Sequence, residues 1–125
     1  MSLNITWVTI DCAEPAPIAR WWAEALGWTV AYKSDDEYVI EPPEAGPYAW
    51  RLLFIKVPDT KSVKNRLHLD LRPDDQAAQV TRLEALGAKR IDIGQGDSVP
   101  WVVMADPFRN EFCVLRALRE GEDPP

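Results

Sequence analysis

Glu24-Ala25-Leu26-Gly27 and Glu84-Ala85-Leu86-Gly87 are the same four residues, sixty positions apart in a chain of 125. At the same spacing, the apolar stretch Leu53-Phe54-Ile55 is matched in character by Cys113-Val114-Leu115. Recurrence of several features in one order is the signature of a repeated structural unit. We therefore predict two copies of one supersecondary unit within a single domain.

Each copy has the same pattern of hydrophobic residues. An alternating segment, typical of a strand with two different faces, precedes an apolar stripe at helical spacing that ends at Gly27 or Gly87. Three short strand-like segments follow, separated by turn residues. This order predicts an α+β fold made of two βαβββ modules. The expected strands are about 3–10, 29–33, 37–41 and 50–57 in the first copy, and about 66–71, 89–93, 100–105 and 111–115 in the second.

The same pattern sets the expected domain organisation. Module one should span about 3–57 and module two about 66–116, joined by 58–65, within one domain of residues 1–125. The first helix should begin near Pro15, where a missing N–H costs little, and Asp74 or Asp75 should cap the second. The loops include 94–98, and we expect a disordered polar tail over about 119–125.

Composition excludes several classes of function. The formal charge is -6 and the basic residues are scattered, so we expect no nucleic-acid partner. No apolar run reaches the roughly 20 residues of a membrane helix, and the N-terminus lacks the features of a signal peptide. We therefore expect a cytoplasmic protein with no membrane partner. The two cysteines, Cys12 and Cys113, form no C-x-x-C motif, which argues against a structural zinc site.

The stretch Asp106-Pro107-Phe108-Arg109-Asn110-Glu111-Phe112, together with the paired modules and helices ending in Ala-Leu-Gly, resembles the vicinal oxygen chelate superfamily. This group includes glyoxalase I, bleomycin-resistance proteins, fosfomycin-resistance enzymes and extradiol dioxygenases. The similarity covers about residues 4 to 116 and is strongest for short bacterial glyoxalase-like domain proteins. It implies facing modules that form a ligand-binding cleft, and a homodimer.

In that superfamily, the first and last strands of each module each offer one ligand to a divalent metal. The matching positions are Trp7 and Arg51 in the first module and His68 and Glu111 in the second. An indole does not ligate metals, and a guanidinium stays protonated and repels a dication. We therefore predict that no metal cofactor is used. The alternative is one divalent metal ion held by His68 and Glu111, with Asp70, two residues along the same strand, as a third ligand.

Three roles stay open for the charged side chains of this site. Arg51 and Glu111 could form an ion pair in the metal's place, Arg51 could bind an anionic group of a ligand, or both could be solvated charges. His68 is either a structural residue or, as histidine often is, a general base, with Glu111 orienting its ring.

Aromatic side chains make up the rest of the expected cleft. Trp7 should face it, and Trp50, Trp101 and Phe108 lie in or beside later strands, although each of these three could instead be core or dimer interface. Cys113 should also face the cleft, as a buried and unreactive thiol.

These features favour a protein that captures a small aromatic or amphipathic molecule, as bleomycin-resistance proteins do. The rival class is an enzyme of the same superfamily, a lyase, isomerase or dioxygenase that uses His68 and Glu111 as catalytic residues. A third possibility is an accessory domain with no ligand.

Overall fold

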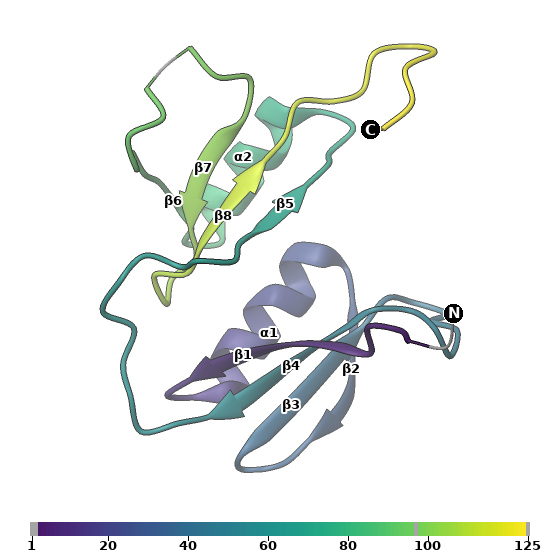
Figure 1. Ribbon diagram of the computed structural model, residues 1–125, viewed down its shortest axis with the longest axis vertical. Helices are drawn as coiled ribbons and strands as arrows, with labels where there is room; N and C mark the ends of the chain where they lie inside the picture. Colours follow the sequence, from purple (N-terminus) through teal and green to yellow (C-terminus); the bar gives the residue numbers. More distant parts are fainter. Residues whose placement is uncertain (1–2, 97, 125) are drawn as a thin grey trace. The chain divides into compact units, whose positions relative to one another are not determined.

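The computed structural model describes residues 3–96 and 98–124, and its chain forms two compact units, Met1–Lys61 and Ser62–Pro125 (Figure 1). Each unit carries one strand, one helix and then three strands, so the predicted α+β fold of two βαβββ modules is confirmed. Residues 1, 2, 97 and 125 are not among the described residues. All four belong to the predicted domain, residue 97 also to the predicted loop 94–98, and residue 125 also to the predicted tail over about 119–125.

The first unit is a four-stranded sheet covered by one helix. In sequence order its elements are β1 (Trp7–Cys12), α1 (Pro15–Leu26), β2 (Thr29–Lys33), β3 (Glu37–Glu41) and β4 (Arg51–Lys56). The strands lie in the order β1-β4-β3-β2, with β1 parallel to β4 and the other pairs antiparallel. The first and last strands of the module are therefore neighbours, which brings residues distant in sequence side by side.

Helix α1 forms where the sequence predicts it. Pro15 is the first helical residue, and Gly27 ends the helix in the left-handed conformation with φ 69. Ile18 and Trp22 recur at helical spacing and are buried, and α1 packs against β2, β3 and β4. The opposing core residues from the sheet include the fully buried Phe54, so α1 covers this face of the sheet.

The second unit repeats this arrangement. Its elements are β5 (Leu69–Leu71), α2 (Gln76–Ala85), β6 (Lys89–Arg90), β7 (Val102–Ala105) and β8 (Glu111–Val114), in the order β5-β8-β7-β6. Of the two predicted caps, Asp75 caps α2, and its carboxylate accepts a hydrogen bond from the Ala78 backbone N–H. Val80 and Leu83 of α2 are buried together with Phe112 and Val114 of β8.

Several strands are shorter than the sequence pattern predicts, and one end of β1, of β5 and of β6 differs most. Strand β1 begins at Trp7, β5 begins at Leu69, and β6 ends at Arg90. The early end of β6 has a local cause, because Gln95 bonds the backbone N–H of Ile93 and the carbonyl of Ile91 through its side chain. These bonds fold the segment into a loop in place of a continued strand ladder.

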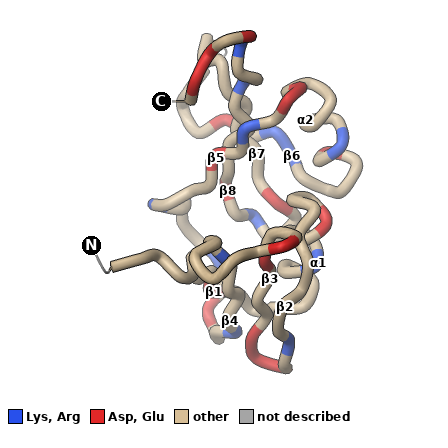
Figure 2. Tube along the Cα trace, turned by 90° about the vertical axis from the view of Figure 1, so that its right-hand side faces the viewer, with Lys and Arg blue, Asp and Glu red and all other residues tan. Residues whose placement is uncertain are grey.

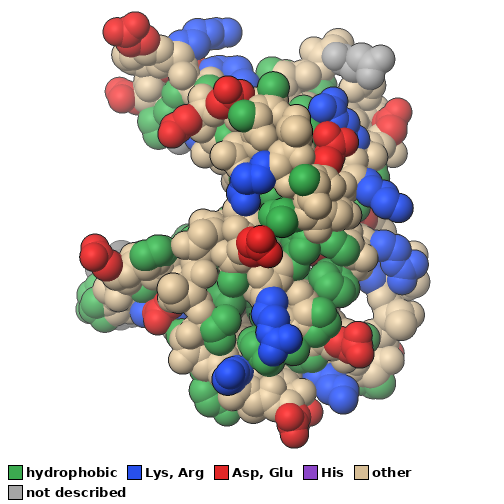
Figure 3. Space-filling view, turned by 180° about the vertical axis from the view of Figure 1, so that it is seen from behind, with side chains coloured by type: hydrophobic (Ala, Val, Ile, Leu, Met, Phe, Trp, Pro, Cys, Tyr) green, Lys and Arg blue, Asp and Glu red, His purple; other side chains and the backbone are tan. Residues whose placement is uncertain are grey.

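The charges are distributed as the sequence predicts. Basic and acidic residues are both scattered along the trace of each unit (Figure 2), and side chains of both signs are interspersed with apolar ones on the surface that Figure 3 shows. Among the described residues, no helix has the length and apolar character needed to cross a membrane. The cytoplasmic location stays a prediction.

Candidate functional site

In the first unit, strand pairing places Trp7 directly beside Arg51. They are register partners in the parallel pair β1–β4, in which Ile10 pairs with the fully buried Phe54. Because side chains alternate along a strand, Trp7 and Arg51 lie on the face opposite that of Ile10 and Phe54, away from α1. Trp7 is 51% exposed there. The indole is therefore available at the surface of its unit.

Arg51 is held by contacts within its own unit. Its Nε lies 2.8 Å from Oε2 of Glu41 on the neighbouring strand β3, with both side chains largely shielded from solvent. Nη1 donates to the carbonyl of Ala49 at 3.1 Å, and Nη2 donates to the carbonyl of Gly46 at 3.2 Å. The guanidinium thus has a partner for each nitrogen and fastens the loop that precedes β4. The sequence does not predict Glu41 as a partner of Arg51, since the two become neighbours only through the pairing of β3 with β4.

In the second unit, strand pairing brings His68 and Glu111 side by side, at the places that Trp7 and Arg51 occupy in the first unit. Strand β5 runs parallel to β8, with Leu69 opposite Phe112 and Asp70 opposite Cys113. Continuing this register back by one residue places His68 beside Glu111, as Trp7 lies beside Arg51 in the first unit. Phe112 and Val114 of β8 pack in the core with α2. Because side chains alternate along a strand, the opposite face of this sheet carries four candidate side chains, those of His68, Asp70, Glu111 and Cys113.

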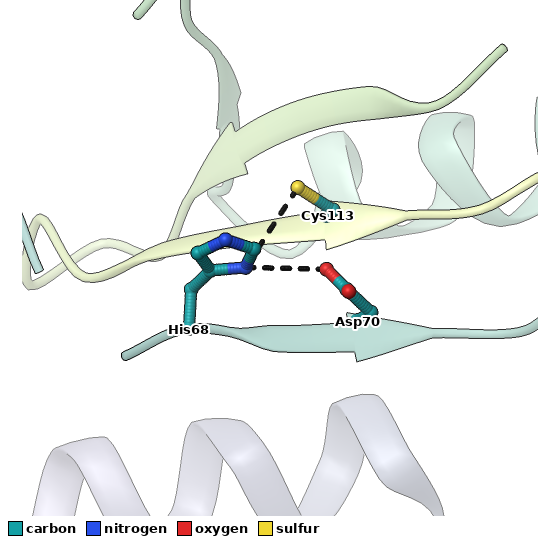
Figure 4. A group of neighbouring side chains, drawn as sticks. All are labelled: His68, Asp70 and Cys113. Carbon is teal, nitrogen blue, oxygen red and sulfur yellow. Dashed lines mark hydrogen bonds and ion pairs between the residues drawn. The ribbon is translucent and has the colours of Figure 1, made fainter. Parts of the chain in front are cut away.

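His68, Asp70 and Cys113 form a compact cluster on that face (Figure 4). Nδ1 of His68 lies 3.1 Å from Oδ1 of Asp70 and 4.0 Å from Sγ of Cys113. One donor atom from each residue lies within 4.8 Å of those of the other two. The imidazole and carboxylate are partly exposed, with side-chain exposures of 35% and 49%, whereas Cys113 is buried. Asp70 is thus the carboxylate in contact with the histidine ring.

The thiol of Cys113 is poorly suited to nucleophilic attack. Burial, reinforced by the negative charge of Asp70 and a hydrogen bond to it, raises the pKa of Cys113 to about 11, against a smaller opposite effect of Lys64. The reactive form of a cysteine is its thiolate, which is scarce at neutral pH when the pKa is this high. The same holds for Cys12, whose pKa burial and Asp11 raise to about 11, and both cysteines are free thiols.

The remaining candidate residues are described within their own units. Oε2 of Glu111 accepts a hydrogen bond from the backbone N–H of Asn65 at 3.1 Å. Phe108 is half-buried in a turn that the buried Asp106 fixes by accepting its backbone N–H at 2.8 Å. Trp101 directly precedes β7 and Trp50 directly precedes β4, and both are exposed.

Proteins of known structure share this fold. A glyoxalase/bleomycin resistance protein/dioxygenase family enzyme from Burkholderia phytofirmans is 17% identical with a TM-score of 0.69, over 93% of this chain and 100% of its own. Fosfomycin resistance protein FosX from Mesorhizobium loti is 12% identical with a TM-score of 0.68, over 96% of both chains. Trypanothione-dependent glyoxalase I from Leishmania major is 14% identical with a TM-score of 0.65, over 92% of this chain and 87% of its own. A search of curated proteins found no match.

The repeated βαβββ units and these structural neighbours define the fold, which is that of glyoxalase/bleomycin-resistance/dioxygenase proteins. Within that class, the family model described as a glyoxalase-like domain matches residues 7–115. The chain belongs to this glyoxalase-like domain family.

The donor set at the four positions that correspond to the superfamily's metal ligands is incomplete. The second unit supplies an imidazole from His68 and a carboxylate from Glu111, whereas the first unit supplies an indole and a guanidinium that is already ion-paired with Glu41. Two donors fall short of the three or four protein ligands of a typical catalytic metal site, so these four residues do not fit such an ion.

Proposed function

We propose that this glyoxalase-like protein binds a small aromatic or amphipathic organic molecule, and that binding requires no metal ion at the superfamily's four ligand positions. The observation that carries the proposal is the pair Trp7–Arg51, which puts a half-exposed indole and a neutralised cation where ligands would stand. An indole contributes a large apolar area and a stacking surface, which suit a flat ligand.

Further aromatic side chains support the proposal. Trp50 and Tyr48 are exposed in the segment that Arg51 fastens before β4, and Trp101 is exposed before β7. Exposed tryptophans in these places are consistent with ligand capture. We also propose a homodimer, which rests on family membership and which light scattering of the purified protein tests.

A fluorescence titration tests the binding function. Purified protein in chelator-containing buffer is titrated with a panel of planar aromatic and amphipathic compounds, bleomycin included, and tryptophan quenching is followed. At least one compound should bind, and Trp7→Ala should weaken its binding at least tenfold. Tyr32→Ala is the matched control, because Tyr32 is 53% exposed against 51% for Trp7 but lies on β2. Equal losses in the two variants would remove Trp7 from the site.

A second candidate function is proton-transfer catalysis, and the contact between His68 and Asp70 favours it. A carboxylate 3.1 Å from Nδ1 favours the tautomer protonated there, which leaves Nε2 as the acceptor that a general base needs. If the protein turns over its ligand, His68→Gln and Asp70→Asn should lower kcat with little change in affinity. If it only binds, both variants should change affinity mildly and no product should form.

A further inference from the structure

The cluster of His68, Asp70 and Cys113 has a composition that a purely structural hydrogen-bond group does not require. It brings together one nitrogen, one oxygen and one sulfur donor, each from a residue type that ligates metals. It lies wholly within the second unit, on β8, β5 and the residue before β5 (Figure 4). We propose that this cluster is a binding site for a zinc ion, which shares His68 with the four positions used by the superfamily but takes its other two ligands, Asp70 and Cys113, from outside them.

The distances suit zinc coordination. Zinc bonds of about 2.0–2.3 Å at tetrahedral angles put neighbouring donor atoms about 3.3–3.6 Å apart. The measured separations from Nδ1 are 3.1 Å to the carboxylate of Asp70 and 4.0 Å to the sulfur of Cys113. These two separations differ from the required value by about half an ångström or less. The third, between Asp70 and Cys113, is within 4.8 Å, and rotation of the side chains has to shorten it. The register pair Asp70–Cys113 already fixes two of the three ligands.

The chemistry of the donors selects among ions. A thiolate and an imidazole are poor ligands for Mg²⁺ and Ca²⁺, which prefer oxygen, but good ligands for Zn²⁺. The thiolate of Cys113 and the carboxylate of Asp70 together balance the charge of a dication. Binding requires the thiol to lose its proton to solvent, as it does in other cysteine-ligated zinc sites.

The surroundings give the ion a route of entry and an open coordination position. Cys113 lies on the inner side of the cluster at 5% exposure, while His68 and Asp70 are partly exposed on the outer side. Three protein ligands leave a fourth position for water or for an oxygen of a small molecule, as in catalytic zinc sites. The inference does not rest on the proposed ligand binding, which is measured in the presence of chelator.

Cobalt substitution tests the site directly. Metal-free full-length protein is titrated with Co²⁺ and then with Zn²⁺, and the thiolate-to-cobalt charge-transfer absorption is recorded. One equivalent of Co²⁺ should produce the band, and Zn²⁺ should abolish it. Cys113→Ser should remove the band, and Asp70→Asn should weaken binding at least tenfold. The matched control Cys12→Ser replaces the other thiol and should keep both band and affinity.

Four outcomes would overturn the zinc site. They are the absence of stoichiometric binding by the unsubstituted protein, a band that survives in Cys113→Ser, unchanged affinity in Asp70→Asn, and binding that is lost in Glu111→Gln but kept in Cys113→Ser. The last would place the ion at the superfamily position instead. Circular dichroism establishes folding of each variant, and Asp70→Asn, at a partly exposed side chain, keeps the test decisive if Cys113→Ser does not fold.

Discussion

The role of Arg51 in this structure differs from the role expected at its position. The resemblance to the superfamily assigns Arg51 to a metal-ligand position, whereas in the structure its nitrogens bond Glu41, Ala49 and Gly46 within the first unit. Charge-assisted bonds in a partly buried setting contribute more than exposed ones. Arg51 therefore acts as a fastening for the segment before β4, and pairing of Arg51 with Glu111 stays a prediction.

A stability measurement separates this role from that of an ordinary surface charge. Arg51→Ala should lower the free energy of unfolding by about 1–2 kcal/mol, because it removes these bonds and leaves Glu41 without its cation. The control is Arg90→Ala, whose pair with Glu84 is long at 3.7 Å and mostly exposed, and which should cost less than about 0.5 kcal/mol. Urea denaturation of both variants measures the difference, and equal costs would argue against the fastening role.

The sequence predicts part of the site at this scale. The superfamily resemblance assigns Trp7 and Arg51 to the positions equivalent to His68 and Glu111, and the strand registers are consistent with this equivalence. What the sequence does not reveal is which neighbour each side chain bonds. Asp70 is two residues from His68, so its contact is foreseeable from the period of a strand. Glu41 is not, because its proximity depends on the pairing of β3 with β4.

At the scale of elements, the helices differ in how they begin. Helix α1 begins with proline and has no side-chain cap, whereas α2 is capped by Asp75. Asp75→Ala should therefore destabilise the protein by about 1 kcal/mol, because an N–H at the helix start loses its acceptor. Asp75→Asn keeps an acceptor and should be nearly neutral. Thermal unfolding followed by circular dichroism compares them, and an equal loss in both would show that the cap bond itself contributes little.

Glycine follows both helices, as the C-cap Gly27 of α1 and as Gly87 directly after the C-cap Leu86 of α2, and the second glycine is more confined. Gly27 has φ 69 and open space where a side-chain carbon would project, whereas Gly87 has φ 106 and such a carbon would lie 3.3 Å from Cγ of Pro107. Gly27→Ala should cost about 1 kcal/mol from backbone strain alone. Gly87→Ala should cost more, because contact with Pro107 adds to the strain. Chemical denaturation ranks the two, and the reverse order would contradict the packing.

The segment after β8 carries a testable charge pair. Arg116 bonds both carboxylate oxygens of Glu122 at 2.7 Å, and the backbone N–H of Arg119 bonds one of them. The bond from Arg116, followed by that from Arg119, lowers the pKa of Glu122 to about 2. Because the folded-state pKa lies below the ordinary value, the pair stabilises this segment at higher pH and is lost as the pH falls toward about 2.

Nuclear magnetic resonance measures this directly. The side-chain carboxyl of Glu122 should titrate with a midpoint near 2, and Arg116→Gln should move the midpoint up toward 4.5. A midpoint near 4.5 in the unsubstituted protein would show that the pair does not form in solution, as the sequence-based expectation of a disordered tail over about 119–125 implies.

At the scale of the whole molecule, most of the fold is predictable because both copies of the repeat predict the same order of strands and helix. Each module gives an independent reading of the same element order, and hydrophobic periodicity fixes the element types. Strand ends are less predictable, since they depend on single side-chain bonds such as those of Gln95 beside β6. Function is less predictable still, because one fold supports many chemistries and the decisive features are a few substituted positions.

The most direct test of the central claim compares ligand binding with and without metal. A compound that quenches tryptophan fluorescence is titrated into the protein in chelator, and again after Mn²⁺ or Ni²⁺ replaces the chelator. We expect affinities that agree within about twofold, because Trp7 and Arg51 offer no donor to a bridging ion. Binding that disappears in chelator and returns with either ion would contradict the account.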